Sequence, residues 1–183
     1  MADILEIPKR PVRKFLEEDF KVTSWDVLKP HFEALLERKI DSVEELKKWF
    51  LDRSELESVI AEDLAWRYIQ MTCFTENEDY RKHYQDFIEN IQPQIAPVSD
   101  KLNKKAADSP LLDALSKIQG YDIMIRSLRK EIEIFREENV PLYTEINIET
   151  QKYAQLNGAM MVEMEGKELT LQQAAVFLMS TDR

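Results

Sequence analysis

The sequence predicts an all-α fold, a multi-helix array or bundle with one small β-hairpin near the C-terminus. Three observations carry this prediction. Only three of the 183 residues are glycine, so the chain lacks the turn residues that a many-stranded sandwich or barrel needs. Apolar residues recur at helical spacing along most of the chain. Residues 160–164 alternate as a strand does, and the pair Glu165-Gly166 behind them fits a tight turn.

We expect three parts: an irregular N-terminal arm over residues 1–20, a helical domain over residues 21–158, and a hairpin plus helix over residues 159–183. The arm contains Pro8 and Pro11, which disfavour a helix. Its apolar anchors are Leu5, Ile7, Phe15, Leu16 and Phe20. A chain of this length can bury about two-thirds of its unfolded surface, so a real core is feasible.

Thr23 or Ser24 is expected to cap the first helix, in which Pro30 lies deep enough to predict a kink or a restart near Lys29. Two Ser-x-x-Glu capping boxes follow, beginning at residues 42 and 54. They predict two helices, a short one to about residue 51 and a long one over about residues 55–73. The long helix presents an apolar stripe widened by aromatic residues: Leu56, Val59, Ile60, Leu64, Trp66, Tyr68, Ile69 and Met71.

The second half of the chain is expected to hold four more helical stretches. One runs from about residue 77 to about residue 107, interrupted or kinked by Pro93 and Pro97. Another starts at Ser109-Pro110. After Gly120, a helix over residues 121–138 carries Ile125, Leu128, Ile132 and Phe135 in register. It is expected to be central, because Met124 and Ile134 fall outside that stripe.

A fourth stretch opens at Pro141 and runs to about residue 157, with Gly158 as its C-cap. After the hairpin, Thr170 is expected to cap the final helix. Ser180-Thr181 would normally start another helix, so we expect the chain to be cut there from a longer protein.

The net charge of −10 argues against a nucleic-acid or membrane-surface partner, since both favour an excess of lysine and arginine. The N-terminus lacks the design of a signal peptide, and no run approaches the roughly 18 apolar residues that a membrane span needs. A cytoplasmic location is the simplest expectation.

No catalytic, cofactor-binding or metal-binding residue is assigned from the sequence. The two histidines, His31 and His83, each stand alone on a predicted helix, and no His-Glu-x-x-His motif is present. Cys73 lies on an apolar helical stretch, where a buried, inert thiol is the default. A hydrolase using Cys73 or a histidine would need long-range pairing that the sequence does not indicate.

Three further features have structural interpretations. Asp63 and Arg67 are four residues apart near an apolar stripe, which predicts an internal ion pair that orients neighbouring helices. Arg129 and Glu133 predict a second such pair on a charged helix face. Four of the seven methionines lie between residues 160 and 179, which favours a docking surface over a cofactor site.

Four segments, in order, resemble one family: FKVTSW at 20–25, LESVIAEDLAWRY at 56–68, FREENVPL at 135–142 and MVEMEGKELTLQQAA at 161–175. They look like the N-terminal domain of oligoendopeptidase F, in the thimet-oligopeptidase-like zinc metallopeptidases. The resemblance implies a helical, two-lobed parent enzyme that cuts short peptides with one zinc, held by a His-Glu-x-x-His helix and a further glutamate. This chain has no counterpart of those residues, so no catalytic residue carries over.

The resemblance implies that the chain is a non-catalytic fragment, inactive alone, which helps to wall the substrate channel and to select short peptides. Its partner would be the missing catalytic region, and surface exposed by truncation could lead to self-association. The alternative is a stand-alone helical interaction or scaffold module with no peptidase role. A reading frame that continues past Arg183 into a His-Glu-x-x-His motif would favour the fragment.

Overall fold

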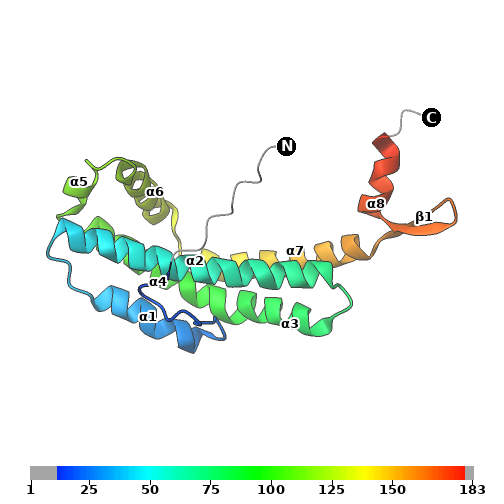
Figure 1. The fold of residues 1–183 in the computed structure, drawn as a ribbon, viewed down its shortest axis with the longest axis horizontal. Coiled ribbons are helices and arrows are strands. Elements are labelled where there is room, and N and C mark those ends of the chain that lie inside the picture. Colours follow the sequence, from blue (N-terminus) through cyan, green and yellow to red (C-terminus); the bar gives the residue numbers. More distant parts are fainter. Residues whose placement is uncertain (1–11, 180–183) are drawn as a thin grey trace.

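The computed structural model describes residues 12–179 and confirms an all-α fold with one hairpin (Figure 1). The elements, in chain order, are α1 Trp25–Glu37, α2 Val43–Cys73, α3 Glu78–Asp86, a π-helical turn η1 Phe87–Ile91, α4 Gln92–Ala107, α5 Leu112–Leu115, α6 Tyr121–Ile134, α7 Asn139–Ala159, β1 Met161–Met164, β2 Lys167–Thr170, α8 Leu171–Ala175 and a 3-10 turn η2 Val176–Met179. Within this part no helix has the length and apolar character needed to cross a membrane.

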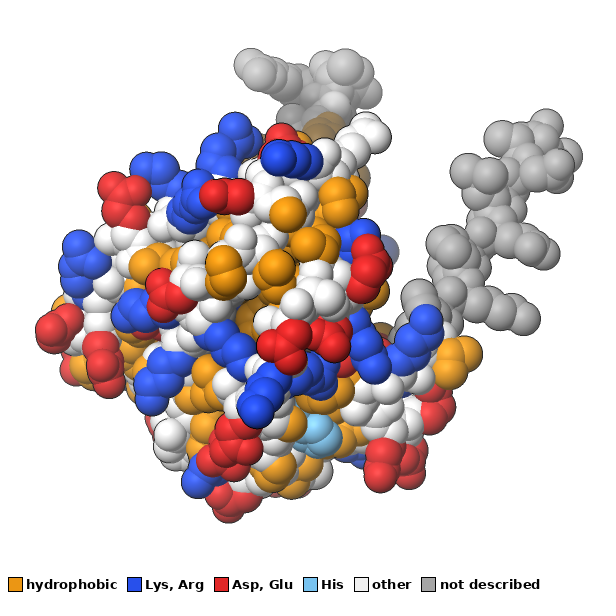
Figure 2. Space-filling model, turned by 90° about the vertical axis from the view of Figure 1, so that its left-hand side faces the viewer, with side chains coloured by type: hydrophobic (Ala, Val, Ile, Leu, Met, Phe, Trp, Pro, Cys, Tyr) orange, Lys and Arg blue, Asp and Glu red, His pale blue; other side chains and the backbone are white. Residues whose placement is uncertain are grey.

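The helical body is elongated along α2. In Figure 1, α1 and the continuous stretch from α3 to α4 lie on one side of α2, and α7 runs along the same axis. The hairpin and α8 stand at the far end of α7, away from the helical body. Figure 2 looks at the opposite end, where acidic and basic side chains are interspersed, so charge of one sign is not concentrated on that face.

The core lies where α1, α2, α4, α5 and α6 meet. Its fully buried large side chains are Trp49, Phe32, Phe87, Leu28, Leu35, Leu46, Leu56, Ile91, Leu102, Leu112 and Leu115. Burying one such side chain stabilises the fold by about 1.5–3 kcal/mol. The Trp49 Nε1–H donates to the Leu35 carbonyl at 2.9 Å, so the only polar group of this indole is paired between α2 and α1.

The first helix does not restart near Lys29, because α1 continues through Pro30. Pro30 lies six residues into α1, so its missing N–H and its ring affect only the carbonyl of Asp26 in the first turn. Both residues are exposed, so water can reach that carbonyl.

The expectation of two helices between residues 42 and 73 is wrong, since α2 is one helix of 31 residues. The Ser42 hydroxyl does accept from the Glu45 amide, at 3.2 Å, but the Glu45 carboxylate accepts from the amide of Asp41 instead of Ser42. Ser54 lies inside the helix, where its carbonyl accepts from the Ser58 hydroxyl. A Ser-x-x-Glu pattern marks a helix start only where the preceding residues are not helical. The residues before Ser54 already belong to α2, so no new helix starts there.

Glu55 lies within the second Ser-x-x-Glu pattern and binds the N-terminal arm. Its carboxylate accepts hydrogen bonds from the backbone amides of Lys14, Phe15 and Leu16, at 2.8, 3.0 and 2.8 Å. Burial tends to raise the pKa of this carboxyl, but those bonds and the Arg13 charge outweigh burial and leave the pKa below its ordinary value.

The described part of the arm, residues 12–20, contains no helix or strand. Of the anchors, Leu16 is buried and Phe15 and Phe20 are half-buried, while Leu5 and Ile7 lie outside the described residues. The last residues of the arm, from Phe15 to Phe20, therefore pack on the helical body.

The irregularity expected near Pro93 is a π-helical turn just before it, while Pro97 lies within α4. The Gln92 amide donates to the carbonyl of Phe87, five residues back. Pro93 has no N–H and its ring would crowd a carbonyl four residues back, so a wider turn at this point relieves the clash without breaking the helix.

The helix expected over residues 121–138 is shorter and less central than predicted. It ends at Ile134, because Phe135 adopts extended backbone with ψ 132°. Its buried residues are Ile125 and Leu128, whereas Ile123 and Ile134 are exposed. One side of α6 therefore packs on the core, and the prediction of a helix covered on several sides is wrong.

At Ser109-Pro110 only a turn forms, and α5 begins two residues later.

The hairpin forms as predicted. Met161 pairs with Thr170 and Met164 with Lys167 in an antiparallel register. Glu165 and Gly166 both have positive φ, 53° and 73°, as the two central positions of a type I′ turn require. The α7 helix differs at its end, since Gly158 lies inside it and the chain leaves the helix at Met160. Thr170 caps α8 in a full capping box with Gln173. The helix start expected at Ser180-Thr181 lies outside the described residues.

Candidate functional site

Most of the large apolar side chains of α7 are exposed to solvent. Four of them and Met160, which follows the last residue of the helix, are each more than half exposed: Leu142, Ile146, Tyr153, Leu156 and Met160. We call this set the α7 seam. The spacing of four, seven and three residues keeps the four helical members on one side of a helix with 3.6 residues per turn, where the exposed Glu149 also lies.

The inner face of α7 is mixed, with Ile148 packed against the core among several polar side chains. Gln151 is buried there and its Nε2–H contacts the Met71 sulfur of α2 at 3.3 Å. Thr144, Asn147 and Gln155 on the same side are half-buried. A solvent-facing helix normally gathers its large apolar residues inside, whereas α7 leaves most of its own exposed. A group of exposed apolar side chains of this kind is typical of an interaction site.

Further apolar side chains are exposed beyond the end of the α7 seam. They lie on the hairpin and on η2: Met161, Val176, Phe177, Leu178 and Met179. The methionine-rich segment predicted as a docking surface is thus exposed in the described residues. This surface and the α7 seam follow each other along the chain, so one partner could cover both.

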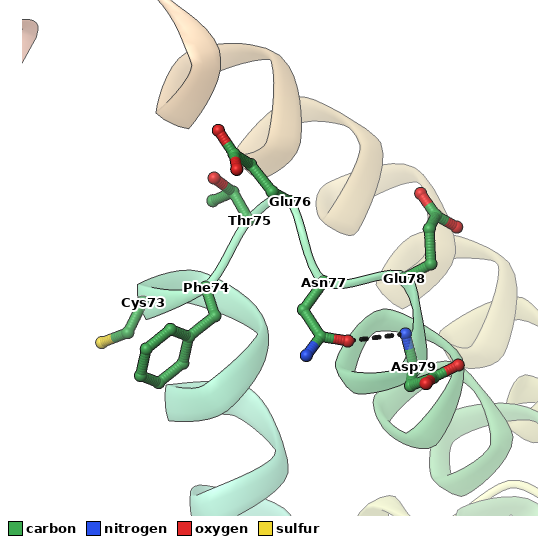
Figure 3. A pocket seen from close by; sticks show the side chains of 7 residues that line it. All are labelled: Cys73, Phe74, Thr75, Glu76, Asn77, Glu78 and Asp79. Carbon is green, nitrogen blue, oxygen red and sulfur yellow. Dashed lines mark hydrogen bonds between the residues drawn. The ribbon is translucent and has the colours of Figure 1, made fainter.

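Cys73 is exposed, and the expectation of a buried thiol is wrong. It lies in the last turn of α2, where the helix reaches past the core and the chain turns through residues 74–77 into α3. Figure 3 shows this open hollow: the Cys73 sulfur points away from Asp79, and Asn77 Oδ1 accepts from the Asp79 amide at 3.0 Å. The groups lining it are acidic or neutral and include neither a histidine to take the thiol proton nor a cation to stabilise a thiolate.

The two histidines lie apart in different surroundings. His31 on α1 makes edge-on contacts with the rings of Phe15 and Phe20, with centroids 5.7 and 4.9 Å away. Burial lowers the pKa of His31, although the nearby Glu17 charge acts in the opposite direction. His83 is exposed on α3, and its carbonyl accepts from Arg67. His31 therefore packs against the arm, and neither histidine faces a nucleophile.

Asp63 and Arg67 form the predicted ion pair, with Arg67 Nε 2.6 Å from Asp63 Oδ2. The same guanidinium donates to the carbonyls of Val22 and His83, at 2.8 and 2.7 Å. Arg67 thus ties α2 to the segment before α1 and to α3, as an orienting ion pair should. The second predicted pair is wrong: Glu133 binds Lys130 at 2.8 Å, and Arg129 lies 3.6 Å from Asp113. These side chains are long and exposed, so a partner three residues away or on another helix competes with the partner four residues away.

A model of the peptidase M3 N-terminal domain matches residues 15–135, about two-thirds of the chain. The chain belongs to the peptidase M3 N-terminal domain family. The matched range runs from the arm anchors through the whole of α6. No curated protein and no solved structure matches the chain.

For this M3 N-terminal domain, metal chemistry can be tested against the residues present. In residues 12–179, no group of three or more His, Cys, Asp or Glu side chains is placed to hold a metal ion. The described donors do not fit a zinc site, so no step is assigned to them through zinc.

Sequence reasoning missed the α7 seam, although the spacing of its residues was visible. What the spacing could not indicate was which face of α7 would be covered.

Proposed function

We propose that this M3 N-terminal domain is the non-catalytic part of an oligoendopeptidase F-like zinc metallopeptidase. The helical body would form one wall of the peptide channel and restrict entry to short peptides. The division into arm, helical domain and hairpin plus helix, at residues 1–20, 21–158 and 159–183, belongs to this proposal, as does a cytoplasmic location. Zinc and its ligands would lie in the catalytic region.

The observation that carries the proposal is the exposed α7 seam. Most of the large apolar side chains of α7 face solvent although Ile148 and Gln151 pack on the body, which suits a helix that lies between two parts of a larger protein. Because α7 follows the matched range directly, it lies where an N-terminal domain would lead on to a catalytic region. We propose that region as the partner of the α7 seam.

The test uses the same gene. If its reading frame continues past residue 183, the following region is produced separately and mixed with this chain, and binding is measured by calorimetry. We expect a His-Glu-x-x-His motif in that region, a stable complex, and loss of binding for Leu156→Arg. The matched control Ser127→Arg, at an exposed position on α6 away from the α7 seam and the hairpin, should bind normally.

Four outcomes would count against the proposal. A stop codon at residue 183 would favour the stand-alone scaffold. Equal binding by both variants would remove the α7 seam from the interface. A dimer of the isolated chain that Leu156→Arg does not disrupt would place self-association elsewhere. Peptide cleavage by this chain alone, surviving a chelator, would instead indicate an independent hydrolase.

A further inference from the structure

The hairpin is a two-stranded sheet with little support from the rest of the chain. Its strands β1 and β2 pack chiefly on each other and on α8, and the hairpin stands away from the helical body (Figure 1). A two-stranded hairpin is at best marginally stable in water unless further strands or a helix pack on it. Because α8 has only five residues, a third strand on one edge would stabilise this element substantially.

The turn determines which backbone groups of β1 point away from β2. The two-residue turn at residues 165–166 closes on a hydrogen-bonded pair, Met164 with Lys167. Bonded and non-bonded pairs alternate along an antiparallel ladder, so Glu163 and Glu168 form a non-bonded pair. The backbone N–H and C=O groups of Glu163 therefore point outward, along the free edge of β1.

The two edges of the hairpin differ. By the same alternation Met161 also turns its backbone groups outward, and residues 12–179 provide no hydrogen-bond partner for Met161 or Glu163 on that side. On β2 the Thr170 N–H donates to Gln173 Oε1 at 2.9 Å, because the chain turns there into α8. The β1 edge is therefore open at two successive outward-facing positions, whereas the β2 edge is closed at its end.

The side chains beside the open edge indicate the chemistry of a third strand. Glu163 and Glu168 lie directly opposite each other in a non-bonded pair, the arrangement that brings side chains closest across a ladder. Like charges in this position destabilise a sheet, and neither carboxylate has an ion-pair partner in the described part of the chain. A lysine or arginine placed next to Glu163 by a neighbouring strand would offset this repulsion.

The other face of the hairpin is apolar. Val162, Met164 and Leu169 are half-buried on that face. Side chains of a strand alternate between the two faces of a sheet, so every second residue of a strand beside β1 would lie next to Val162 and Met164. Apolar side chains suit those positions. The strand that matches this edge therefore alternates basic with apolar residues.

A second copy of this chain does not match the edge. Antiparallel pairing of two β1 strands would add another Glu163 carboxylate to the Glu163–Glu168 pair. Charged side chains on an edge strand are a common protection against such pairing between copies. The charge of this edge thus favours a different, basic segment.

We infer that the outer edge of β1 binds an extended strand of alternating basic and apolar residues, antiparallel to β1, supplied by the catalytic region of the same enzyme. Addition of a strand to an open sheet edge is a common mode of peptide recognition, in which the backbone gives affinity and alternate side chains give specificity. Antiparallel addition places a basic side chain directly opposite Glu163. The source of the strand rests on the proposed function, whereas the open edge and its chemistry do not.

The probe is the peptide Lys-Val-Lys-Val-Lys with blocked ends. It is titrated into the full 183-residue chain and followed by amide chemical shifts. We expect saturable binding, shifts confined to the hairpin and α8, and slower hydrogen exchange of the Met161 and Glu163 amides. The charge-reversed peptide Glu-Val-Glu-Val-Glu should bind at least tenfold more weakly.

A matched pair of peptides separates strand addition from simple attraction between opposite charges. In the antiparallel arrangement the lysines opposite Met161 and Glu163 turn their N–H groups toward β1, and the valines turn theirs away. N-methylation of the central lysine should therefore weaken binding at least tenfold. N-methylation of one valine, which leaves the charge and the number of methyl groups the same, should not.

A matched pair of variants tests the edge from the side of the protein. Glu163→Pro and Glu168→Pro each remove one carboxylate and one outward-facing N–H, on β1 and β2 respectively. Neither N–H belongs to the ladder between β1 and β2, so proline is compatible with both positions. Glu163→Pro should abolish binding, whereas Glu168→Pro should keep the affinity within about threefold. The N-methylated peptides leave the protein unchanged, so they remain decisive if Glu163→Pro disturbs the hairpin.

The inference is overturned by no saturable binding at millimolar peptide, by equal affinity of the two N-methylated peptides, by shifts that map outside the hairpin and α8, or by equal affinity of the two proline variants. Its failure is distinct from failure of the proposed function. If the peptide binds but the separately produced catalytic region does not, the source of the strand is wrong. If the catalytic region binds in a manner sensitive to Leu156→Arg while the peptide does not bind, the docking role stands and the β1 edge is not part of it.

Discussion

Replacing Arg67 by glutamine removes the cation that holds three segments of the body together. Its guanidinium pairs with Asp63 on α2 and donates to the carbonyls of Val22 and His83. The Arg67 Cζ also lies 5.5 Å from the centroid of the Phe87 ring. All of these contacts depend on the planar, five-donor guanidinium, which glutamine cannot reproduce.

The expected loss follows from burial. A hydrogen bond that involves a charged group contributes about 1.5–3 kcal/mol, and breaking a buried ion pair costs about 3–5 kcal/mol. The Asp63 side chain is 28% exposed and water can partly replace the guanidinium there, so we expect the low end, about 3 kcal/mol. For a domain of this size that corresponds to a fall in Tm of roughly 6–12 °C.

The assay is thermal and urea unfolding followed by far-UV circular dichroism. Arg129→Gln is the matched control, because its pair with Asp113 at 3.6 Å is exposed on both sides and should contribute less than about 0.5 kcal/mol. Adding Asp63→Asn to Arg67→Gln should cost less than the two single changes together, since the two side chains interact. If Arg67→Gln and Arg129→Gln differ by less than about 1 kcal/mol, the reasoning is wrong.

Three further predictions follow from single side chains. The pKa of Glu55 lies below its ordinary value of 4.5, so its hydrogen bonds to the arm stabilise the fold fully above pH 4.5 and less as the pH falls through the lowered pKa. Glu55→Gln should therefore differ most from the wild type above pH 4.5, and a difference in unfolding free energy that does not change with pH would refute this. The exposed Cys73 should react with a thiol reagent in the native protein as completely as in the unfolded protein; a thiol that needs denaturant would contradict its placement. Ile146→Asn combined with Leu156→Asn should reduce binding of a hydrophobic dye while changing the unfolding free energy by less than about 1 kcal/mol, because neither side chain is in the core; a loss like that of a core substitution would show that the α7 seam is covered.

Several predictions that rested on interactions within a few residues were confirmed, although the Arg129–Glu133 pair and the second capping box were not. Thr170 and Gln173 form their capping box, Glu165 and Gly166 form the turn, and Arg67 pairs with Asp63 four residues away. In each case both partners are brought together by one turn of local backbone, so the sequence spacing already contains the geometry.

Predictions that depended on which neighbour covers a helix were mostly wrong. Ser54 does not start a helix, because the residues around it pack within the longer α2 on other elements, and Glu55 binds a segment about 40 residues away. Cys73 is exposed because α2 extends past the core. A local pattern describes how apolar a face is, and it does not determine what lies against that face.

The sequence by itself determined an all-α class, the hairpin, most helix positions and the resemblance to a peptidase N-terminal domain, because these depend on local spacing and on residue identity. Only the tertiary structure decided that the α7 seam faces solvent and that Asp100 and Asn103 are buried where α4 borders a cleft. Both depend on how α7 and the end of α6 rest against α4. That packing is set by contacts between residues tens of positions apart, which no window along the chain contains.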